Sequence, residues 1–527
     1  MASAAALISG DPMTSISDIY PAGVREEARS EGAGDGTPAA YISYHRHRDP
    51  AIGEEEEEDG GGAGARAPLP VAAARPHQPH APPQLAYAFL DAGLHVTFLH
   101  THHNLRRRRA APHHPRLRLL SIPDGLPADH PRSVATLMEL LHSMRTASAA
   151  AFRALLRKEP AVTCAVVDGI MPFAITAAEE LGVPALAFRT EMAGAFLCYL
   201  SVPRLLELGE TPAASDEPVR GVPGMEGVLR RRDLPRVAPS EPDPVRVLLA
   251  VADNAAHCAA GSSRALILNA AASMEAPAIA RIAPRIRGGV FAVGPLHARP
   301  SPPSRSAGDD DDDDGCTAWL DGHSDRSVVY VNLGSLMVLS TEQLAELLHG
   351  LAAGGHPFLC VLGPDMSSSS AVRDAAAAGG ERAAALVVEW SAHRDVHRVL
   401  RHRAVGCFFT HAGWNSVLEA AVEGVPAVCW PFFFADQHTA SRFVAAVWKT
   451  GLDMKDVACD RGVVARMVGE VMASPEIRAA AEAMATQLRR EVAKGGSSAT
   501  ELERLVGYIT ELAAKDNNSS SLGTGYI

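Results

Sequence analysis

The sequence predicts an α/β fold made of two Rossmann-like, doubly wound domains with a ligand cleft between them. Short apolar runs such as residues 94–100 (LHVTFLH) alternate with helical segments of ten or more residues, which is the pattern of βαβ units around a parallel sheet. The alternation stops at residues 298–315, where proline, serine and consecutive aspartates form a polar linker, and then starts again. Ligands bind at the carboxyl ends of such strands, so we expect the cleft to lie there.

Each half of the chain carries its own set of elements. In the first half, the expected strands besides residues 94–100 are RLRLLSIP, TCAVVDG and VPALAF, with helices at SVATLMELLHSMRTASAAAFRALLRK and FAITAAEELG. In the second half, the expected strands are SVVYVNLGS, FLCVLG, ALVVEW, AVGCFFTH and VPAVCWP, with helices from Thr341, from Asn415 and onward to Ala514.

These patterns also set the expected boundaries. Residues 1–67 contain EEEEEDGGGAGA and few large apolar groups, so we expect disorder there. The further expected segments are a first domain at 68–300 with an aberrant start at 68–83, a linker at 301–315, a second domain at 316–498, a helix at 499–514 and a disordered tail at 515–527.

Composition excludes several classes of function. The net charge is −12, but the acidic runs at residues 54–59 and 309–314 hold twelve acidic side chains, so the remainder is close to neutral. A nucleic-acid-binding surface would need a basic excess. The eight cysteines show no CxxC pair, which favours free thiols in a reducing compartment. The chain has no apolar run of about 18 residues and no signal-peptide pattern, so we expect a cytoplasmic protein without membrane insertion.

The most informative stretch is residues 390–437, WSAHRDVHRVLRHRAVGCFFTHAGWNSVLEAAVEGVPAVCWPFFFADQ. AVGCFF is expected to form a strand that ends in Thr-His-Ala-Gly, and a helix then begins near Asn415. A turn of small residues before a helix N-terminus presents backbone N–H groups and the positive end of the helix dipole, which suits a diphosphate. His411, Asn415 and Ser416 add side-chain donors at the same place.

This stretch strongly resembles the signature box of the plant secondary-product, UDP-dependent glycosyltransferases (family 1). The match depends on THAGWNS, LEAAVEGVP and the final ADQ, and the resemblance extends over residues 84–514. It implies a GT-B fold and a metal-independent, inverting transfer from a UDP-sugar, with residues 68–300 as the acceptor domain and 316–498 as the donor domain. It implies no cofactor and no metal site, since UDP-glucose is the donor substrate.

Carried over by position, the resemblance implies a role for each residue of the box. Trp390 would stack on the uracil, and Glu419 would accept hydrogen bonds from the ribose hydroxyls. His393 is a further residue implied to bind the donor. The implied diphosphate contacts are Ser335, His411, Gly413, Asn415 and Ser416. The implied sugar-facing residues are Trp414, Asp436 and Gln437. A final Gln is similar to what glucose-using members carry.

Each residue also has a purely structural interpretation, with Trp390 and Trp414 as core aromatics and Glu419 as a charge on a helix surface. Two departures from the family pattern affect details. Residues 397–399 are inserted after the stacking tryptophan, and WPFFFADQ has one Phe more than the usual WPFFADQ. Because the extra Phe directly precedes the sugar-facing residues, the sequence defines the class of donor better than the donor sugar.

Inverting transfer needs a general base that takes a proton from the acceptor, and a His steadied by a carboxylate suits neutral pH. The resemblance places the carboxylate at a strand end, which Asp168 in TCAVVDGIM matches; its structural interpretation is a helix cap. The His has no clean match. The segment PLPVAAARPHQPHAPPQ is so rich in proline that we expect neither the first strand nor the following helix start to form. His77 and His80 are the candidate substitutes.

The coding frame offers a reason for the unusual segment. Residues 70–81 can be encoded so that a shift of one base gives Pro-Trp-Pro-Leu-His-Gly-His-Ile-Asn-Pro-Met-Leu, which is the loop that the family carries. We therefore hypothesise that this segment is read in the wrong frame and that family sequence resumes by Gln84.

The sequence thus predicts a monomeric glucosyltransferase whose partners are a UDP-sugar donor and a small hydrophobic acceptor. The acceptor would be a terpenoid or iridoid, a flavonol such as quercetin, or a phenolic, with attack by a hydroxyl or carboxyl. FRTEMAGAFLCYLSVPRLLELGE is similar to the subgroup of 7-deoxyloganetic acid and 7-deoxyloganetin glucosyltransferases. Three alternatives stay open: a UDP-sugar-binding pseudoenzyme or frame-shifted product without the catalytic His, a nucleotide-sugar epimerase, and a metal-dependent transferase that uses the acidic run.

Overall fold

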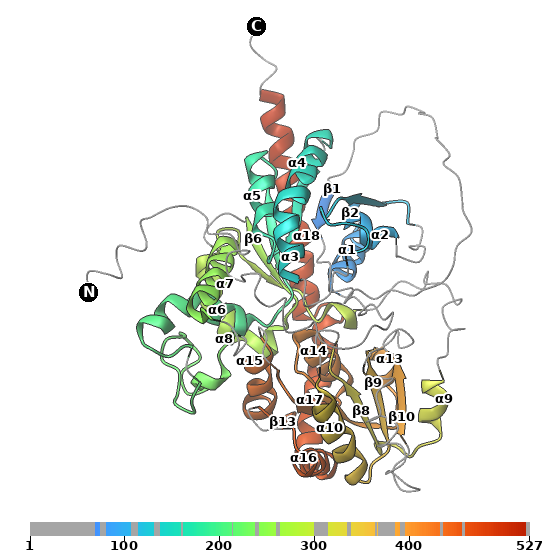
Figure 1. The fold of residues 1–527 in the computed structure, drawn as a ribbon. Helices are drawn as coiled ribbons and strands as arrows, with labels where there is room; N and C mark the ends of the chain where they lie inside the picture. Colours follow the sequence, from blue (N-terminus) through green and yellow to red (C-terminus); the bar gives the residue numbers. More distant parts are fainter. Residues whose placement is uncertain are drawn as a thin grey trace.

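The protein consists of two parallel β-sheets, each flanked by helices, one above the other in Figure 1. The structure is a computed structural model. It describes residues 69–73, 81–106, 114–130, 137–159, 162–212, 214–237, 242–259, 264–299, 315–334, 339–363, 366, 385–389, 396–432, 436–455 and 459–522. The expected segments 1–67 and 301–314 lie outside these residues.

The first domain has a seven-stranded sheet in the order β3-β2-β1-β4-β5-β6-β7. Its strands are β1 (Leu69–Ala73), β2 (Val96–Thr101), β3 (Leu117–Ile122), β4 (Val162–Asp168), β5 (Ala185–Arg189), β6 (Ala265–Leu268) and β7 (Val290–Ala292), all paired in parallel. All seven residues of β4 are buried. This agrees with its continuous apolar sequence, because helices cover both faces of such a sheet.

The expectation that proline would prevent β1 and the following helix is wrong. Strand β1 forms and pairs with both β2 and β4, with only Pro70 inside it, and a register shift falls between Leu69 and Pro70. Helix α1 (Ala81–Asp91) also forms. Pro82 and Pro83 lie in its first turn, where the backbone N–H has no intrahelical partner and a fixed φ suits the helix.

Helices surround the first sheet. They are α1, α2 (His102–Arg106), α3 (Leu137–Ser143), α4 (Ala149–Lys158), α5 (Pro172–Glu180), α6 (Ala193–Glu207), α7 (Pro244–Ala259) and α8 (Ala272–Ile282). The long helix expected from the sequence is present as α3 and α4, joined by a π-helical turn at Met144–Ser148. Strands β6 and β7 were not expected, because each is short.

The second domain has a six-stranded parallel sheet in the order β10-β9-β8-β11-β12-β13. Its strands are β8 (Val328–Asn332), β9 (Phe358–Leu362), β10 (Ala385–Glu389), β11 (Val405–Thr410), β12 (Ala427–Cys429) and β13 (Gly451–Asp453). Its helices are α9 (Cys316–Asp321), α10 (Thr341–Ala353), α13 (Val396–Leu400), α14 (Trp414–Glu423), α15 (Gln437–Arg442), α16 (Arg461–Ala473) and α17 (Pro475–Val492). The N-terminus of α10 has a capping box formed by Ser340 and Gln343.

The last helix returns to the first domain. Helix α18 (Ser497–Leu522) extends past residue 514, where the sequence pattern ended it. Its apolar side chains Leu502, Leu505 and Ile509 join a core cluster with Phe89 and Phe291 of the first domain. The Ser498 hydroxyl donates to the carbonyl oxygen of Gly294 at 2.6 Å. Helix α18 therefore packs against the first domain.

In both sheets the strand order reverses next to the first strand of the domain. The reversal falls between β1 and β4 in the first sheet and between β8 and β11 in the second. Ligand sites of doubly wound sheets lie at such switch points, beyond the carboxyl ends of the strands. Among the described residues, no helix is long and apolar enough to cross a membrane.

Candidate active site

The turn that follows β11 carries the centre of the signature box. Strand β11 ends at Thr410 and pairs with β8 so that Thr410 is opposite Asn332, at the switch point of the second sheet. Ala412 has a φ of 61° and Gly413, the N-cap of α14, has extended backbone. The chain thus reverses over three residues into the first turn of α14, where Asn415 and Ser416 are partly exposed. The helix N-terminus therefore faces the switch point, as the sequence predicts.

The His411 side chain is enclosed between two glycines. A Cβ at Gly334 would lie 2.5 Å from the ring, and one at Gly413 would lie 2.4 Å from it, so any larger residue at either position would displace the imidazole. Burial lowers the pKa of His411 to about 4, although part of the residue remains exposed. The ring is therefore neutral at pH 7 and can donate one ring N–H as a hydrogen bond.

Glu419 is a buried carboxylate on α14. Its Oε1 lies 3.6 Å from Nε2 of His397, which is on α13 within the three inserted residues. The His397 ring stacks on that of His297 from the first domain, with ring centroids 4.4 Å apart. The insertion is therefore part of the contact between the domains, next to the carboxylate that is expected to bind ribose.

Trp414 lies at the domain interface as the first residue of α14. Only 2% of the residue is exposed, and its indole Nε1 donates to the carbonyl oxygen of Asn269 at 2.7 Å. The Trp448 ring lies beside it, with centroids 6.2 Å apart. In this structure the Trp414 side chain therefore joins the domains, and its expected contact with the sugar stays a prediction.

Asp436 and Gln437 are at the N-terminus of α15, where Asp436 is the N-cap, and both are buried. Oε1 of Gln437 accepts a hydrogen bond from the backbone N–H of Phe432 at 3.0 Å. That bond joins the residues on either side of 433–435, which lie outside the described residues. Trp390, His393 and Ser335 also lie outside them.

In the first domain, Asp168 ends β4 at the switch point of its sheet. Asp168 is 1% exposed, and its Oδ1 accepts the backbone N–H of Ile170 at 3.1 Å. In the neighbouring strand, Ala73 is the register partner of Val167, so β1 ends beside Asp168. His77 and His80 fall in the segment between β1 and α1, outside the described residues. The segment that contains His77 and His80 therefore begins at the sheet edge where Asp168 lies.

A charged pair next to Asp168 was not found from the sequence. Arg189, the last residue of β5, is almost fully buried and forms an ion pair with Glu191. Its Nη1 donates to the carbonyl oxygen of Gly169 at 2.7 Å and to Oδ1 of Asn254 at 2.8 Å. The sequence ALAFRTE could have indicated this pair, because it places an Arg at the end of an apolar strand. A charged side chain that is buried there has to be paired.

A second unexpected group is Glu275 on α8. It is 1% exposed, and its Oε1 accepts the N–H of Gly194 at the start of α6, at 2.8 Å. Burial raises the pKa of Glu275 to about 8, opposed by the hydrogen bonds from the start of α6 and assisted by the charges of Asp436 and Glu191. Buried carboxyl groups of both domains, Glu191 and Glu275 from the first and Asp436 from the second, therefore lie near one another.

No group of three or more metal-ligating side chains occurs among the described residues. Two doubly wound parallel-sheet domains, with a helix N-terminus at one switch point and a carboxylate at the other, are the architecture of the GT-B fold. Residues 307–475 match the family model for UDP-glucoronosyl and UDP-glucosyl transferase.

Known proteins of this kind cover most of the chain. A myricetin 3-O-rhamnoside 1,2-glucosyltransferase of Crocosmia x crocosmiiflora is 39% identical over 83% of this chain and 94% of its own length. A 7-deoxyloganetic acid glucosyltransferase of Catharanthus roseus is 35% identical over 81% and 92%. The crystal structure of Os79 from O. sativa in complex with UDP is 26% identical, with a TM-score of 0.69 over 84% of this chain and all of that one.

The chain therefore belongs to the plant UDP-glycosyltransferase family. The resemblance seen in the signature box and the two-domain GT-B fold expected from the sequence are both confirmed.

Proposed function

We propose that this protein transfers glucose from UDP-glucose to a hydroxyl or carboxyl of a small lipophilic plant metabolite, with inversion and without a metal or other cofactor. The observation that carries the proposal is the turn from β11 into α14, which puts His411, the helix N-terminus and Glu419 on one continuous segment at a switch point. That arrangement offers N–H donors to a diphosphate and a carboxylate to a ribose.

The donor would lie along the second domain. Trp390 would stack on uracil, Glu419 would accept the ribose hydroxyls, and the diphosphate would take N–H donors at the start of α14. As the acceptor oxygen attacks the anomeric carbon, the bond from that carbon to the diphosphate breaks and UDP leaves with the electron pair. Donors fixed in advance stabilise the charge that develops on the leaving group.

The acceptor would lose its proton to a His held by Asp168. A positioned general base contributes typically about 10²–10⁴-fold to a rate. In the chain as written, His77 or His80 would have to serve, because both fall in the segment that begins where β1 ends beside Asp168. In the alternate reading frame, the His of Gly-His-Ile-Asn would occupy this segment.

Terpenoids, iridoids, flavonols and phenolics are the proposed acceptors. Support comes from relatives whose names specify myricetin 3-O-rhamnoside and 7-deoxyloganetic acid. We further propose that the protein acts as a cytoplasmic monomer.

Calorimetry with UDP tests the nucleotide site first. We expect the wild-type chain to bind UDP and Trp390→Ala to weaken binding about tenfold, since stacking of a base on an aromatic ring contributes roughly 1–3 kcal/mol. Trp319→Ala is the control, because Trp319 is on α9, which Figure 1 shows apart from α14. Absence of UDP affinity in a folded wild-type protein would overturn the proposal.

Turnover is tested by incubating UDP-glucose with an acceptor panel and comparing the chain as written with its frame-corrected version, with and without chelator. We expect glucoside formation that is insensitive to chelator and faster in the corrected chain. UDP binding without turnover in the chain as written, rescued by the corrected segment, would identify the written chain as a UDP-sugar-binding protein. Sequencing the transcript settles which segment the natural protein carries.

A further inference from the structure

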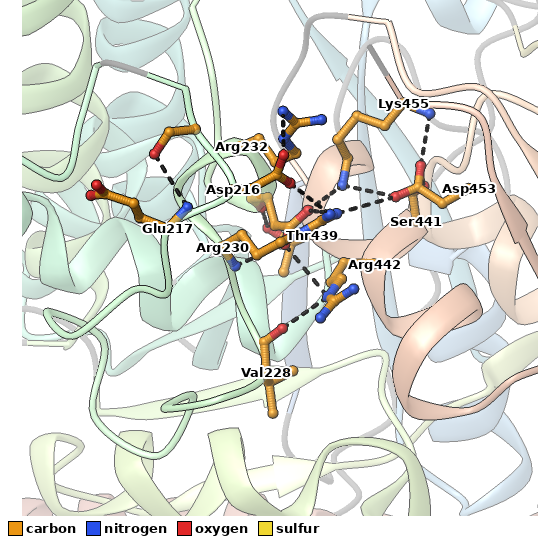
Figure 2. A network of polar contacts seen from close by, with 12 residues as sticks. Asp216, Glu217, Val228, Arg230, Arg232, Thr439, Ser441, Arg442, Asp453 and Lys455 are labelled. Carbon is orange, nitrogen blue, oxygen red and sulfur yellow. Dashed lines mark hydrogen bonds and ion pairs between the residues drawn. The ribbon is translucent and has the colours of Figure 1, made fainter. Parts of the chain in front are cut away.

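A buried network of charged and hydroxyl side chains joins the two domains beside α15 (Figure 2). Its centre is Asp233, in a short helical turn of the first domain (Arg231–Asp233), whose side chain is fully buried. Nζ of Lys455, from the second domain, lies 2.6 Å from Oδ1 of Asp233 and 3.2 Å from Oδ2 of Asp453. Residues 222 positions apart in the sequence are thus joined by one buried ion pair.

Asp233 is ionised in this setting. Burial alone would raise its pKa, but hydrogen bonds from Arg230 and the positive charge of Lys455 outweigh burial and lower the pKa. Arg230 donates to the carboxylate from both its backbone N–H, at 2.8 Å, and its Nε, at 3.0 Å. The carboxylate is therefore held from its own loop and from the opposite domain together.

The same loop holds helix α15 directly. The Thr439 hydroxyl donates to the carbonyl oxygen of Asp233 at 2.8 Å, and Nε of Arg442 donates to the carbonyl oxygen of Val228 at 2.8 Å. On the other side, the Ser441 hydroxyl donates to Oδ1 of Asp453, the carboxylate that Lys455 also contacts. Three of the six residues of α15 are therefore fixed by this network, and two of them are bonded to the first domain.

We infer that Asp233 is a positioning residue for recognition of the donor sugar, because it fixes α15 and with it Asp436 and Gln437. This inference depends on the proposed function. Asp436 and Gln437 begin α15, within one turn of Thr439, so a shift of the helix moves them relative to the first domain. The nucleotide is assigned to α14, which Trp414 ties to Asn269 independently of Asp233. Loss of the network should therefore affect the sugar and spare the uridine diphosphate.

A purely stabilising role does not explain the network well. Replacing a buried ion pair by apolar residues of similar volume is often neutral or stabilising, whereas a charged pair fixes one relative position of its partners. Here that position sets how α15 of the second domain, which begins with Asp436 and Gln437, meets a loop of the first domain.

The test measures the affinities of UDP, UDP-glucose and UDP-galactose by calorimetry for the wild-type chain, Asp233→Asn and Thr439→Val. Thr439→Val is nearly isosteric and removes one hydrogen bond without leaving a buried charge, so it covers the case in which Asp233→Asn does not fold. We expect UDP affinity to stay within about twofold of wild type, and the preference for UDP-glucose over UDP-galactose to fall at least threefold in each folded variant. A lower stability alone would not change that ratio well below the melting temperature.

Asp216→Asn is the matched control. Asp216 is exposed and forms ion pairs with Arg230 and Arg232 on the same loop, so its loss removes a carboxylate from the network's rim and should leave the ratio unchanged. An unchanged ratio in folded Thr439→Val and Asp233→Asn would overturn the inference while leaving the proposed function intact. A folded wild-type protein that binds neither UDP nor UDP-glucose would overturn both.

Discussion

Trp414 donates its indole N–H to the backbone carbonyl oxygen of Asn269 at 2.7 Å. The donor is the first residue of α14 in the second domain, and the acceptor follows β6 in the first domain. Both residues are buried. The helix N-terminus to which we assign the diphosphate is thus fixed to the first domain by this hydrogen bond.

Trp414→Phe tests how much that hydrogen bond contributes to the stability of the protein. The substitution keeps an aromatic ring but leaves the Asn269 carbonyl oxygen buried without this donor, which typically costs about 1–3 kcal/mol. We expect a lower midpoint of thermal unfolding than for Trp319→Phe, the control on α9. Equal midpoints for the two variants would show that the interdomain bond contributes nothing measurable.

Glu419 is expected to accept hydrogen bonds from the ribose hydroxyls. A hydrogen bond to a charged group is worth roughly 1.5–3 kcal/mol, so wild-type protein should bind UDP about tenfold or more tightly than 2′-deoxy-UDP. Glu419→Ala should lose most of that discrimination. Calorimetry with the two nucleotides measures it, and His397→Gln is the control, because it removes the ring 3.6 Å from the carboxylate and keeps the carboxylate itself. Discrimination retained in Glu419→Ala would contradict the assignment.

A double-mutant cycle tests how much the ion pair of Arg189 and Glu191 contributes to stability. Arg189→Met leaves the Glu191 carboxylate buried without its cation and should destabilise the protein by about 3–5 kcal/mol, because removing one partner exposes the full cost of a buried charge. The double variant Arg189→Met with Glu191→Leu should recover much of that loss. Urea unfolding measures both. If the double variant were as unstable as the single one, Arg189 would act chiefly through its bonds to Gly169 and Asn254.

The sequence predicts features that depend on local pattern. The apolar run in the sequence predicts the buried strand β4. The small residues of His-Ala-Gly, followed by a helical pattern, predict the turn into α14. The high proline content of residues 68–83 led to the wrong prediction that β1 would not form. Proline disrupts a strand only at the position where its missing N–H is needed, and Pro70 is the one proline inside β1.

Contacts between distant segments were beyond such reasoning. Nothing near Trp414 specifies a bond to Asn269, 145 positions away, and nothing near Asp233 specifies Lys455. A charged residue within an apolar segment indicates that its side chain is paired when it is buried. Which residue is the partner depends on the fold. The candidate donor site could therefore be predicted as a set of residues, while the interdomain contacts that position it could not.

His411 makes the stability of the protein depend on pH. Its pKa is lowered to about 4 by burial, whereas an unfolded His titrates near about 6.5. Between these values the unfolded chain binds a proton that the folded protein does not, so the free energy of unfolding falls as the pH falls from about 6.5 towards 4. Because part of the residue is exposed, we expect His411 to contribute on the order of 1–2 kcal/mol over this range.

Urea unfolding of wild type and His411→Gln at pH 7, 6 and 5 measures this contribution. Burial also lowers the pKa values of His257 and His356, but these two residues contribute equally to both proteins. Parallel pH profiles for wild type and His411→Gln would show that His411 titrates normally and is not enclosed between Gly334 and Gly413.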